Sequence, residues 1–417
     1  MIPRQILSSV VIPLLLLAGL RWLSASQRRV RPLPVPEERL LVGPMGFCPP
    51  GALYMLSNRN SISLDFADSD HLLLTFRQPT LLRHEPSSKQ VDEGQVIRAL
   101  VVHLPGGEVS ASAEWRMFDH SRYLWPLPGG RFLIRRGNAY FITDTSLTLH
   151  PFVVVPTTVR RTEVSPDGRT LVIEHEYERH TPEEHKRLAA EAERFGEPPP
   201  EEDTQISVLD IPTRKIVAAF RVQSPVSIPI SAEGYLGVST EKSDQFLLRF
   251  VPFQGKPVPL GQVASACTPS ETFLNQKALI IESCDPKGPD VFLDVWTSDA
   301  KKLWSGRREG HLVWPRLAFS FSGTRFAAGF LRISHPIDTA DSLNDEDVKE
   351  QVVQVFDTAT GTPLLATTAS PVLATGQNFA LSAQGDRLAV LRDGAIEIYK
   401  IPSPQSPQAA SAAPVHR

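Results

Sequence analysis

The stretch FALSAQGDRLAVLRDGAIEIYKI, residues 379–401, has the pattern strand, turn, strand, tight turn, strand. Its apolar residues alternate with small or polar ones, which is the period of a half-buried strand. Gly385 ends the first turn, and Asp393-Gly394 between apolar runs is a strong signal for a two-residue hairpin turn. The alternating residues are Phe379, Leu381, Leu388, Val390, Ile396 and Ile398.

The same pattern recurs upstream, each time as an apolar residue, a turn ending in glycine and an apolar strand. The copies are VSPDGRTLVI (164–173), ISAEGYLGV (230–238), FSFSGTRF (319–326) and the degenerate LPGGRFLI (127–134). A second hairpin with a polar tip follows each copy. Four strands at intervals of roughly 40 residues are typical of a propeller blade, so the chain is predicted to be an all-β propeller.

Counting these units predicts seven blades and one incomplete sheet. The last unit has only three strands, and a closed ring needs a fourth to remove the open edge. We expect Ala52–Leu56 near the start of the chain to complete blade seven; the alternative is an extra strand that caps blade one. The blades are predicted to begin near Ser61, Arg122, Val159, Pro225, Ala264, Leu312 and Ala374.

Two of these segments, VSPDGRTLVI and ALSAQGDRLAVL (380–391), resemble the WD40-like β-propeller repeats of the TolB type. VFDTATG (355–361) and VLDIPTRK (208–215) resemble the strand-to-turn segment of WD repeats. The resemblance covers roughly residues 159–401 and, more weakly, 61–152, where RYLWPLPGGRFLIR also resembles exported bacterial propellers. The Gly-His and Trp-Asp pairs of true WD40 repeats are missing. The resemblance therefore implies the architecture, whereas such propellers carry unrelated functions.

The N-terminal segment has the features of an export signal. Arg4 precedes an apolar run of 15 residues, 6–20, which suits a signal-peptide core better than a membrane span. Residues 1–26 are thus predicted to be a signal peptide or a membrane anchor, although Arg21 directly after the run opposes translocation of that side. Residues 27–46 are expected to form a linker, 47–402 the propeller and 403–417 a disordered tail. We expect an exported protein, periplasmic or tethered to the membrane and facing outwards.

Cys267 and Cys284 flank a predicted hairpin that turns at Asn275-Gln276, so the two would lie opposite each other. In an exported protein they are expected to form a disulfide; the alternative is a pair of buried free thiols. Cys48 is left unpaired, and three cysteines with this spacing do not make a zinc site.

Long insertions interrupt three blades, at residues 77–95, 174–205 and 334–351, each between the second and third strand. Such connections all emerge on one face of a propeller, and loops on a rigid scaffold often form binding surfaces. The second insertion is predicted to contain a helix that starts at Thr181-Pro182 and stops at Gly196. Its apolar stripe is expected to pack on the propeller or, alternatively, on a partner; the stripe comprises His185, Leu188, Ala189, Ala192 and Phe195.

No motif in the chain predicts catalysis. There is no Gly-x-Ser-x-Gly elbow and no glycine-rich phosphate loop. His175 and His180 are five residues apart, too far for the i, i+4 pair of a zincin helix. The binding candidates at the crowded rim are Asp119, His120, Arg122, His175, His180, His311 and Arg316. For each of them a structural role, as an ion pair or a solvated loop residue, is the alternative.

The leading hypothesis is a non-enzymatic, monomeric propeller that presents its loop-decorated face to a protein or peptide partner. It requires no cofactor and no metal. A formal net charge of −3 argues against nucleic-acid binding, which favours a basic face. The alternative is a lactonase-like hydrolase with a metal or small-molecule site at the channel mouth. The inner strands are expected to supply Arg, Ser and apolar residues rather than acidic ligands, which disfavours that alternative.

Overall fold

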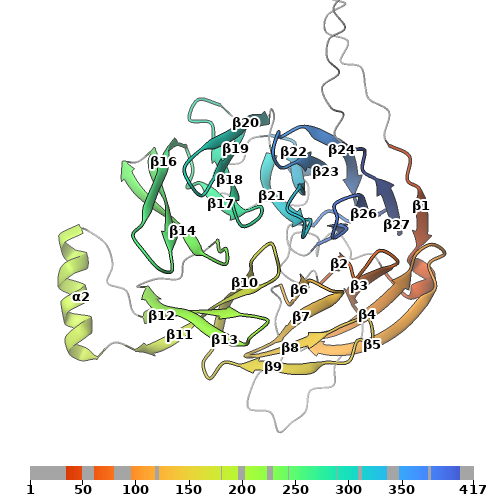
Figure 1. Cartoon of the computed structure of the whole chain (residues 1–417), viewed down its shortest axis with the longest axis horizontal. Helices are drawn as coiled ribbons and strands as arrows, with labels where there is room; N and C mark the ends of the chain where they lie inside the picture. The colour runs from red at the N-terminus through yellow and green to blue at the C-terminus, as the bar shows by residue number, and fades with distance from the viewer. Residues whose placement is uncertain are drawn as a thin grey trace, which may run out of the picture. The chain divides into compact units, whose positions relative to one another are not determined.

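The computed structural model describes residues 34–48, 61–78, 95–117, 122–179, 181–195, 202–222, 229–242, 244–288, 290–308, 312–335, 347–373 and 377–403. From Val35 onwards the chain forms one compact unit. Its strands make seven antiparallel sheets placed around a ring, as Figure 1 shows. The predicted seven-bladed β-propeller is therefore confirmed. The predicted export segment, residues 1–26, and Ala52–Leu56 lie outside the described residues.

The blades follow the chain, and blades 1, 2, 3, 5, 6 and 7 each start with their innermost strand. Blade 1 consists of β2 (Ser63–Phe66), β3 (His71–Arg77), β4 (Gln95–His103) and β5 (Val109–Met117). Blade 2 consists of β6 (Leu124–Leu127), β7 (Arg131–Arg136), β8 (Ala139–Thr143) and β9 (His150–Val154). Blade 3 consists of β10 (Val159–Val164), β11 (Thr170–Arg179), β12 (Glu202–Asp210) and β13 (Lys215–Val222).

Blade 4 consists of β14 (Gly234–Lys242), β15 (Gln245–Pro252) and β16 (Val258–Ala264). Blade 5 consists of β17 (Ser270–Phe273), β18 (Ala278–Cys284), β19 (Val291–Thr297) and β20 (Lys302–Arg308). Blade 6 consists of β21 (Leu312–Phe319), β22 (Arg325–Ile333), β23 (Val348–Asp357) and β24 (Pro363–Ala369). Blade 7 consists of β25 (Phe379–Leu381), β26 (Arg387–Arg392), β27 (Ala395–Lys400) and, from the start of the chain, β1 (Glu38–Leu41).

Blade 4 departs from the regular pattern. Among the described residues its innermost position is reduced to a single bridge between Ile230 and Tyr235, and β14 is the first full strand. The turn that was expected at 231–234 is present, with Ser231 accepting hydrogen bonds from the backbone of Glu233 and Gly234 through its hydroxyl.

The core lies between neighbouring blades. The middle strands are buried on both faces, as in β26, whose four central residues are all inaccessible to solvent. Phe379 and Val390 of blade 7 pack against Ala327 and Val353 of blade 6 in one apolar cluster. Burial of apolar area stabilises each such interface at roughly 25 cal/mol per Å². The ring is thus held together by side chains that alternate along the strands.

The N-terminal strand β1 closes the ring, which confirms the predicted closure but not the predicted segment. Leu40 pairs with Ile396 and Glu38 with Ile398, so β1 occupies the outer edge of blade 7. The expectation that Ala52–Leu56 would take this edge is wrong, because β1 already fills it. The closing strand instead lies within residues 27–46, which the sequence suggested as a linker. Only two apolar residues, Leu40 and Leu41, occupy β1, too few to give a clear strand signal.

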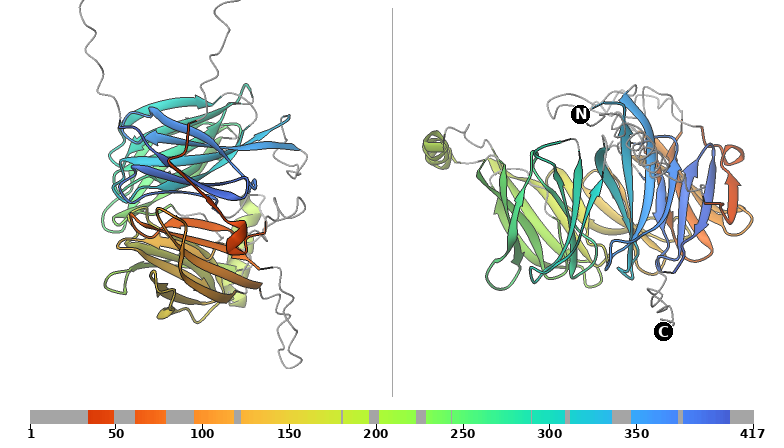
Figure 2. Two further views of the ribbon diagram at one scale, coloured as in Figure 1. Left: turned by 90° about the vertical axis from the view of Figure 1, so that its right-hand side faces the viewer. Right: turned by 90° about the horizontal axis from the view of Figure 1, so that it is seen from above.

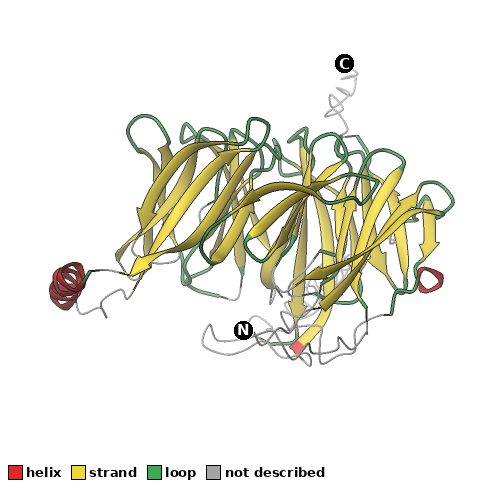
Figure 3. Cartoon of the chain, turned by 90° about the horizontal axis from the view of Figure 1, so that it is seen from below, coloured by secondary structure: helices red, strands yellow, loops and turns green. Residues whose placement is uncertain are grey.

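The interrupted connections lie where they were predicted, between β3 and β4, β11 and β12, and β22 and β23. In antiparallel blades these connections share one face, the insertion face, with the starts of the innermost strands. The opposite turn face carries the connections between first and second and between third and fourth strands. Figure 2 and Figure 3 show the blades from the side, with the described turns gathered along one face.

The predicted helix is α2 (Pro182–Phe195). Thr181 caps it, because its hydroxyl accepts a hydrogen bond from the Glu184 backbone N–H at 3.3 Å. The Glu184 carboxylate in turn accepts a bond from the Thr181 backbone N–H at 3.1 Å. This reciprocal pair is a capping box. Of the described helices, none has the length and apolar character needed to cross a membrane.

The two cysteines of blade 5 form a disulfide. Cys267 and Cys284 are joined with their Cα atoms 5.6 Å apart. Cys267 lies just before β17 and Cys284 ends β18, so the bridge fastens the beginning of the innermost strand to its neighbour. The Ser265 hydroxyl lies beside the bridge and accepts a hydrogen bond from the Cys284 backbone N–H at 3.0 Å. Cys48 is a free, exposed thiol.

Candidate functional site

The turn of blade 3 crosses the axis of the ring and contacts turns of three other blades. Gly168 has a φ of +67°, and a Cβ placed there would lie 2.5 Å from Pro128 in blade 2 and 3.2 Å from Phe321 in blade 6. The side-chain amide of Gln276 in blade 5 donates to the Asp167 carboxylate at 2.8 Å. This position needs glycine both for its backbone conformation and for the close approach.

A further hydrogen bond extends this contact to blade 7, where the backbone N–H of Ser322 donates to the Ala383 carbonyl at 3.2 Å. The first turns of five blades therefore meet across the turn face. The innermost strands lead into these turns, which therefore lie across one end of the channel.

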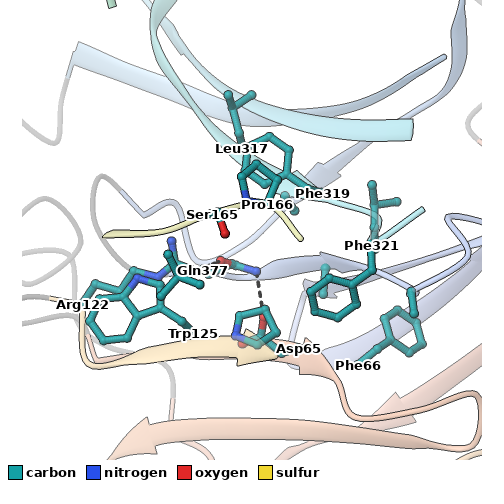
Figure 4. Close-up of a pocket in the computed structure, with 16 residues that line it drawn as sticks. Asp65, Phe66, Arg122, Trp125, Ser165, Pro166, Leu317, Phe319, Phe321 and Gln377 are labelled. Carbon is teal, nitrogen blue, oxygen red and sulfur yellow. Dashed lines mark hydrogen bonds between the residues drawn. The ribbon is translucent and has the colours of Figure 1, made fainter. Parts of the chain in front are cut away.

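These turns line part of a cavity of about 70 Å³, which Figure 4 shows in close-up. We call it the channel pocket. A single water needs a cavity of roughly 10–15 Å³, so the pocket has room for a few waters or one small chemical group. Its walls are Asp65, Phe66, Arg122, Trp125, Pro126, Val164, Ser165, Pro166, Leu317, Ala318, Phe319, Phe321, Gln377, Ala380, Leu381 and Ala383.

Three polar side chains follow one another along the wall formed by blades 7, 1 and 2. The Gln377 amide N–H donates to Asp65 Oδ1 at 3.1 Å, the dashed line in Figure 4. Arg122 Nη2 donates to Gln377 Oε1 at 3.4 Å. The Ser63 hydroxyl bonds the second Asp65 oxygen at 2.8 Å. Gln377 thus links an acidic and a basic group across the junction of the first and last blades.

The backbone fixes this row of side chains. Ser63 and Gln377 form a parallel bridge between blades 1 and 7. The Leu64 N–H donates to the Gln377 carbonyl, and the Gln377 N–H donates to the Ile62 carbonyl, each at 2.9 Å. Because Leu64 faces the apolar core between these blades, its neighbours Ser63 and Asp65 face the channel.

Asp65 is fully buried, and burial raises its pKa to about 7. The Arg122 guanidinium and the hydrogen bonds from Ser63 and Gln377 act in the opposite direction, but they do not outweigh the desolvation of the carboxylate. The protonation of this wall of the pocket therefore changes near neutral pH.

Arg122 is held at the pocket by its own strand. Its Nε donates to the Leu124 carbonyl at 3.0 Å, and its guanidinium lies 5.6 Å from the centre of the Trp125 ring. The neighbouring Tyr123 points the other way and hydrogen-bonds Thr75 at 2.6 Å and the Ser61 carbonyl at 2.7 Å. Anchoring Tyr123 in blade 1 orients the chain so that Arg122, which is exposed, turns into the channel.

More charged groups face the same space from blades 3 and 6. Arg161 and Glu163 of β10 form an ion pair at 3.2 Å. Burial lowers the pKa of Arg316 in β21; repulsion from Arg122 and Arg161 adds to this effect, and Glu163 opposes it. Arg316 therefore feels charges from blades 2 and 3 through the channel. Burial also raises the pKa of Glu174, on the strand beside Arg161, to about 7.

The structure brings together two of the candidates from the sequence, Arg122 and Arg316, at the channel. His175 lies elsewhere, within blade 3, with its ring nitrogens 2.8 Å from the Thr157 hydroxyl and 3.1 Å from the Ser207 hydroxyl. Burial lowers its pKa, so it is a neutral structural histidine at pH 7. The remaining candidates, Asp119, His120, His180 and His311, lie outside the described residues.

Sequence reasoning missed Asp65, Gln377 and Trp125. A single acid on a short strand, or a glutamine in a loop before one, gives no signal by itself. Asp65 is one residue from the first turn of its blade, and that position was the available clue. Across the described ranges, no group of three or more His, Cys, Asp or Glu side chains is placed to hold a metal ion.

The comparison with known proteins supports the assignment of the fold and nothing further. No protein-family model matches the chain, and no curated protein matches it in sequence. The acylaminoacyl peptidase of Pyrococcus horikoshii is similar in structure, with a TM-score of 0.50 and 9% identity over 83% of this chain and 52% of the peptidase. The propeller domain of the trilobed protease from Pyrococcus furiosus has a TM-score of 0.45 and 9% identity over 84% of this chain and 99% of that domain.

An oligogalacturonate lyase in complex with manganese has a TM-score of 0.43 and 12% identity over 84% of this chain and 99% of the lyase. The chain spans about half the length of the peptidase that it matches. At these identities the likeness places the chain among seven-bladed propellers and carries no activity with it.

Proposed function

We propose that the chain is a non-enzymatic binding module, exported from the cytoplasm, that receives a protein or peptide partner on its insertion face. The observation that carries this proposal is the geometry of the channel. The turns of five blades meet at its turn-face end, and the starts of its innermost strands, with Arg122 at one of them, lie on the face from which the three insertions leave. The mouth of the channel and the three insertions therefore lie on the same face.

The chemistry of the pocket favours binding over hydrolysis. Among the described residues that line it, one has a hydroxyl, Ser165, and none is histidine or cysteine. The Ser165 hydroxyl donates to the Asp167 carboxylate at 2.5 Å and accepts a bond from the Thr170 N–H at 2.9 Å. Both bonds belong to the turn, and a serine nucleophile needs an adjacent general base. We also propose that the repeats of this chain are related to the WD40-like repeats of the TolB type, which they resemble in sequence.

Site-specific crosslinking tests which face meets the partner. A photo-crosslinking residue replaces Arg332, which is 54% exposed at the end of β22 beside the blade 6 insertion. The matched control replaces Lys301, an exposed residue in the β19–β20 connection on the turn face. In cells that express the protein at its native level, we expect an adduct from position 332 and none from 301.

Adducts from position 301 alone, or from neither position, would contradict the proposal. Metal analysis of the purified protein addresses the hydrolase alternative. A tightly held divalent ion at one per chain, together with loss of the position-332 adduct, would favour an enzyme.

A further inference from the structure

The channel pocket combines the guanidinium of Arg122 with a small volume. We propose that it binds a carboxylate group, with the Arg122 guanidinium as the main donor. This inference rests on the proposed binding function and specifies the chemistry of what that function would recognise. Three properties of the pocket carry it: the unused donors of Arg122, the balance of charge and the shape.

Arg122 has hydrogen-bonding capacity to spare. A guanidinium has five N–H donors in a planar fork that matches the two oxygens of a carboxylate. Its Nε bonds the Leu124 carbonyl at 3.0 Å, and its Nη2 makes a long bond of 3.4 Å to Gln377 Oε1. The Arg122 side chain lines the pocket and is drawn in Figure 4. An arriving carboxylate would meet a guanidinium that its own strand already holds in place.

The charges around the pocket favour an anion. Arg122, Arg161 and Arg316 interact through the channel space, and the first two repel the third. Glu163 offsets one of these charges by pairing with Arg161 at 3.2 Å. The buried carboxyls Asp65 and Glu174 are partly neutral at pH 7. A bound carboxylate would place a negative charge beside the Arg122 guanidinium.

The size and shape of the channel pocket limit which molecules can carry the carboxylate. About 70 Å³ holds one such group, well below the 300–1,000 Å³ of a pocket for a drug-sized ligand. The far walls, Leu317, Phe319 and Phe321, are apolar. Pro166 and Phe321, which belong to the turns that meet across the axis, line this pocket, so we expect an extended chain to end inside it. The carboxylate therefore belongs either to the C-terminus of a peptide or to a small free acid.

Binding of two matched probe sets to the intact protein tests the proposal and separates these sources. One set is a random tripeptide library with free C-termini, together with the same library in amidated form. The other is acetate, propionate and butyrate. Retention on the immobilised protein is measured by mass spectrometry for the peptides and by a thermal shift for the acids. We expect free-acid tripeptides to be retained over their amides.

Three variants assign the effect to the guanidinium. Arg122→Gln is expected to weaken retention roughly 10- to 100-fold, the usual range for loss of a charge-assisted pair. The control is Arg136→Gln in the same blade, which also removes a guanidinium that lies over an aromatic ring, 5.8 Å from the centre of Phe141. It should bind as the wild type does. Arg122→Lys keeps the charge without the fork and should fall between the two.

Binding of propionate or butyrate without the peptides would identify a free acid as the source and support the carboxylate site. Equal retention of acids and amides would overturn it, as would an Arg122→Gln variant that folds and binds like the wild type. If no probe binds but position 332 still crosslinks to a partner, this inference falls and the proposed function stands. If probes bind and no crosslink forms, the carboxylate site stands and the proposed partner face falls.

Discussion

Two adjacent leucines in β1 test the closure of the ring. Leu40 is 6% exposed and packs in the cluster between blades 7 and 1, whereas Leu41 is 57% exposed. Leu40 Cδ2 also lies 3.0 Å from where a Cβ on Gly107 would be, so it covers the outer turn of blade 1. Truncation of a buried leucine to alanine usually costs about 2–5 kcal/mol. Because β1 is an edge strand, we expect about 2–3 kcal/mol for Leu40→Ala.

The same truncation at Leu41 removes exposed atoms and should change the free energy of unfolding by about 0.5 kcal/mol or less. Urea titration followed by tryptophan fluorescence measures both variants under identical conditions. A strand that slips by one residue exchanges its two faces. Equal losses, or a larger loss at Leu41, would therefore refute the pairing of Leu40 with Ile396 and with it the closure by β1.

Three further perturbations probe the disulfide, the buried acid and the contact of the blade 3 turn with other blades. Replacing Cys267 and Cys284 with serine should lower the free energy of unfolding by about 3 kcal/mol, the chain-entropy value for a loop of this length, in urea titrations. Because the pKa of Asp65 is raised to about 7 in the folded protein, wild-type stability relative to Asp65→Asn should fall as the pH rises from about 4 to about 7 and then level off. Gly168→Ala should lower the melting temperature more than Gly394→Ala, since both have positive φ but only the first places a Cβ against other blades.

For each of these three predictions, a particular result would contradict it. Reducing agent should destabilise the wild type and leave the serine variant unchanged; an effect on both would remove the disulfide as the cause. A stability difference between wild type and Asp65→Asn that is flat from pH 4 to pH 7 would mean that folding does not raise the pKa of Asp65. Equal melting temperatures for the two glycine variants would show that the turn of blade 3 does not reach across the axis.

The sequence predicts what depends on neighbouring residues and misses what depends on distant ones. The hairpin at Asp393-Gly394 and the capping box at Thr181 follow from the chemistry of a few consecutive residues, and both are present. The position of the insertions follows from counting strands. In contrast, the pairing of Asp65 with Gln377 spans 312 residues and depends on how the ring closes. No local pattern marks such a pair.

The wrong choice of closing strand has the same origin. Ala52–Leu56 is the more hydrophobic segment, and the need for a fourth strand in blade 7 was sound. Closure, however, is decided by which segment meets the neighbouring blade as well as the edge of β27. Glu38 accepts a hydrogen bond from the Gly106 N–H at 2.7 Å, and Leu40 covers Gly107, so β1 fastens to blade 1 and blade 7 together. The strand that closes the ring has to fit both neighbouring blades, and the hydrophobicity of a segment does not predict that fit.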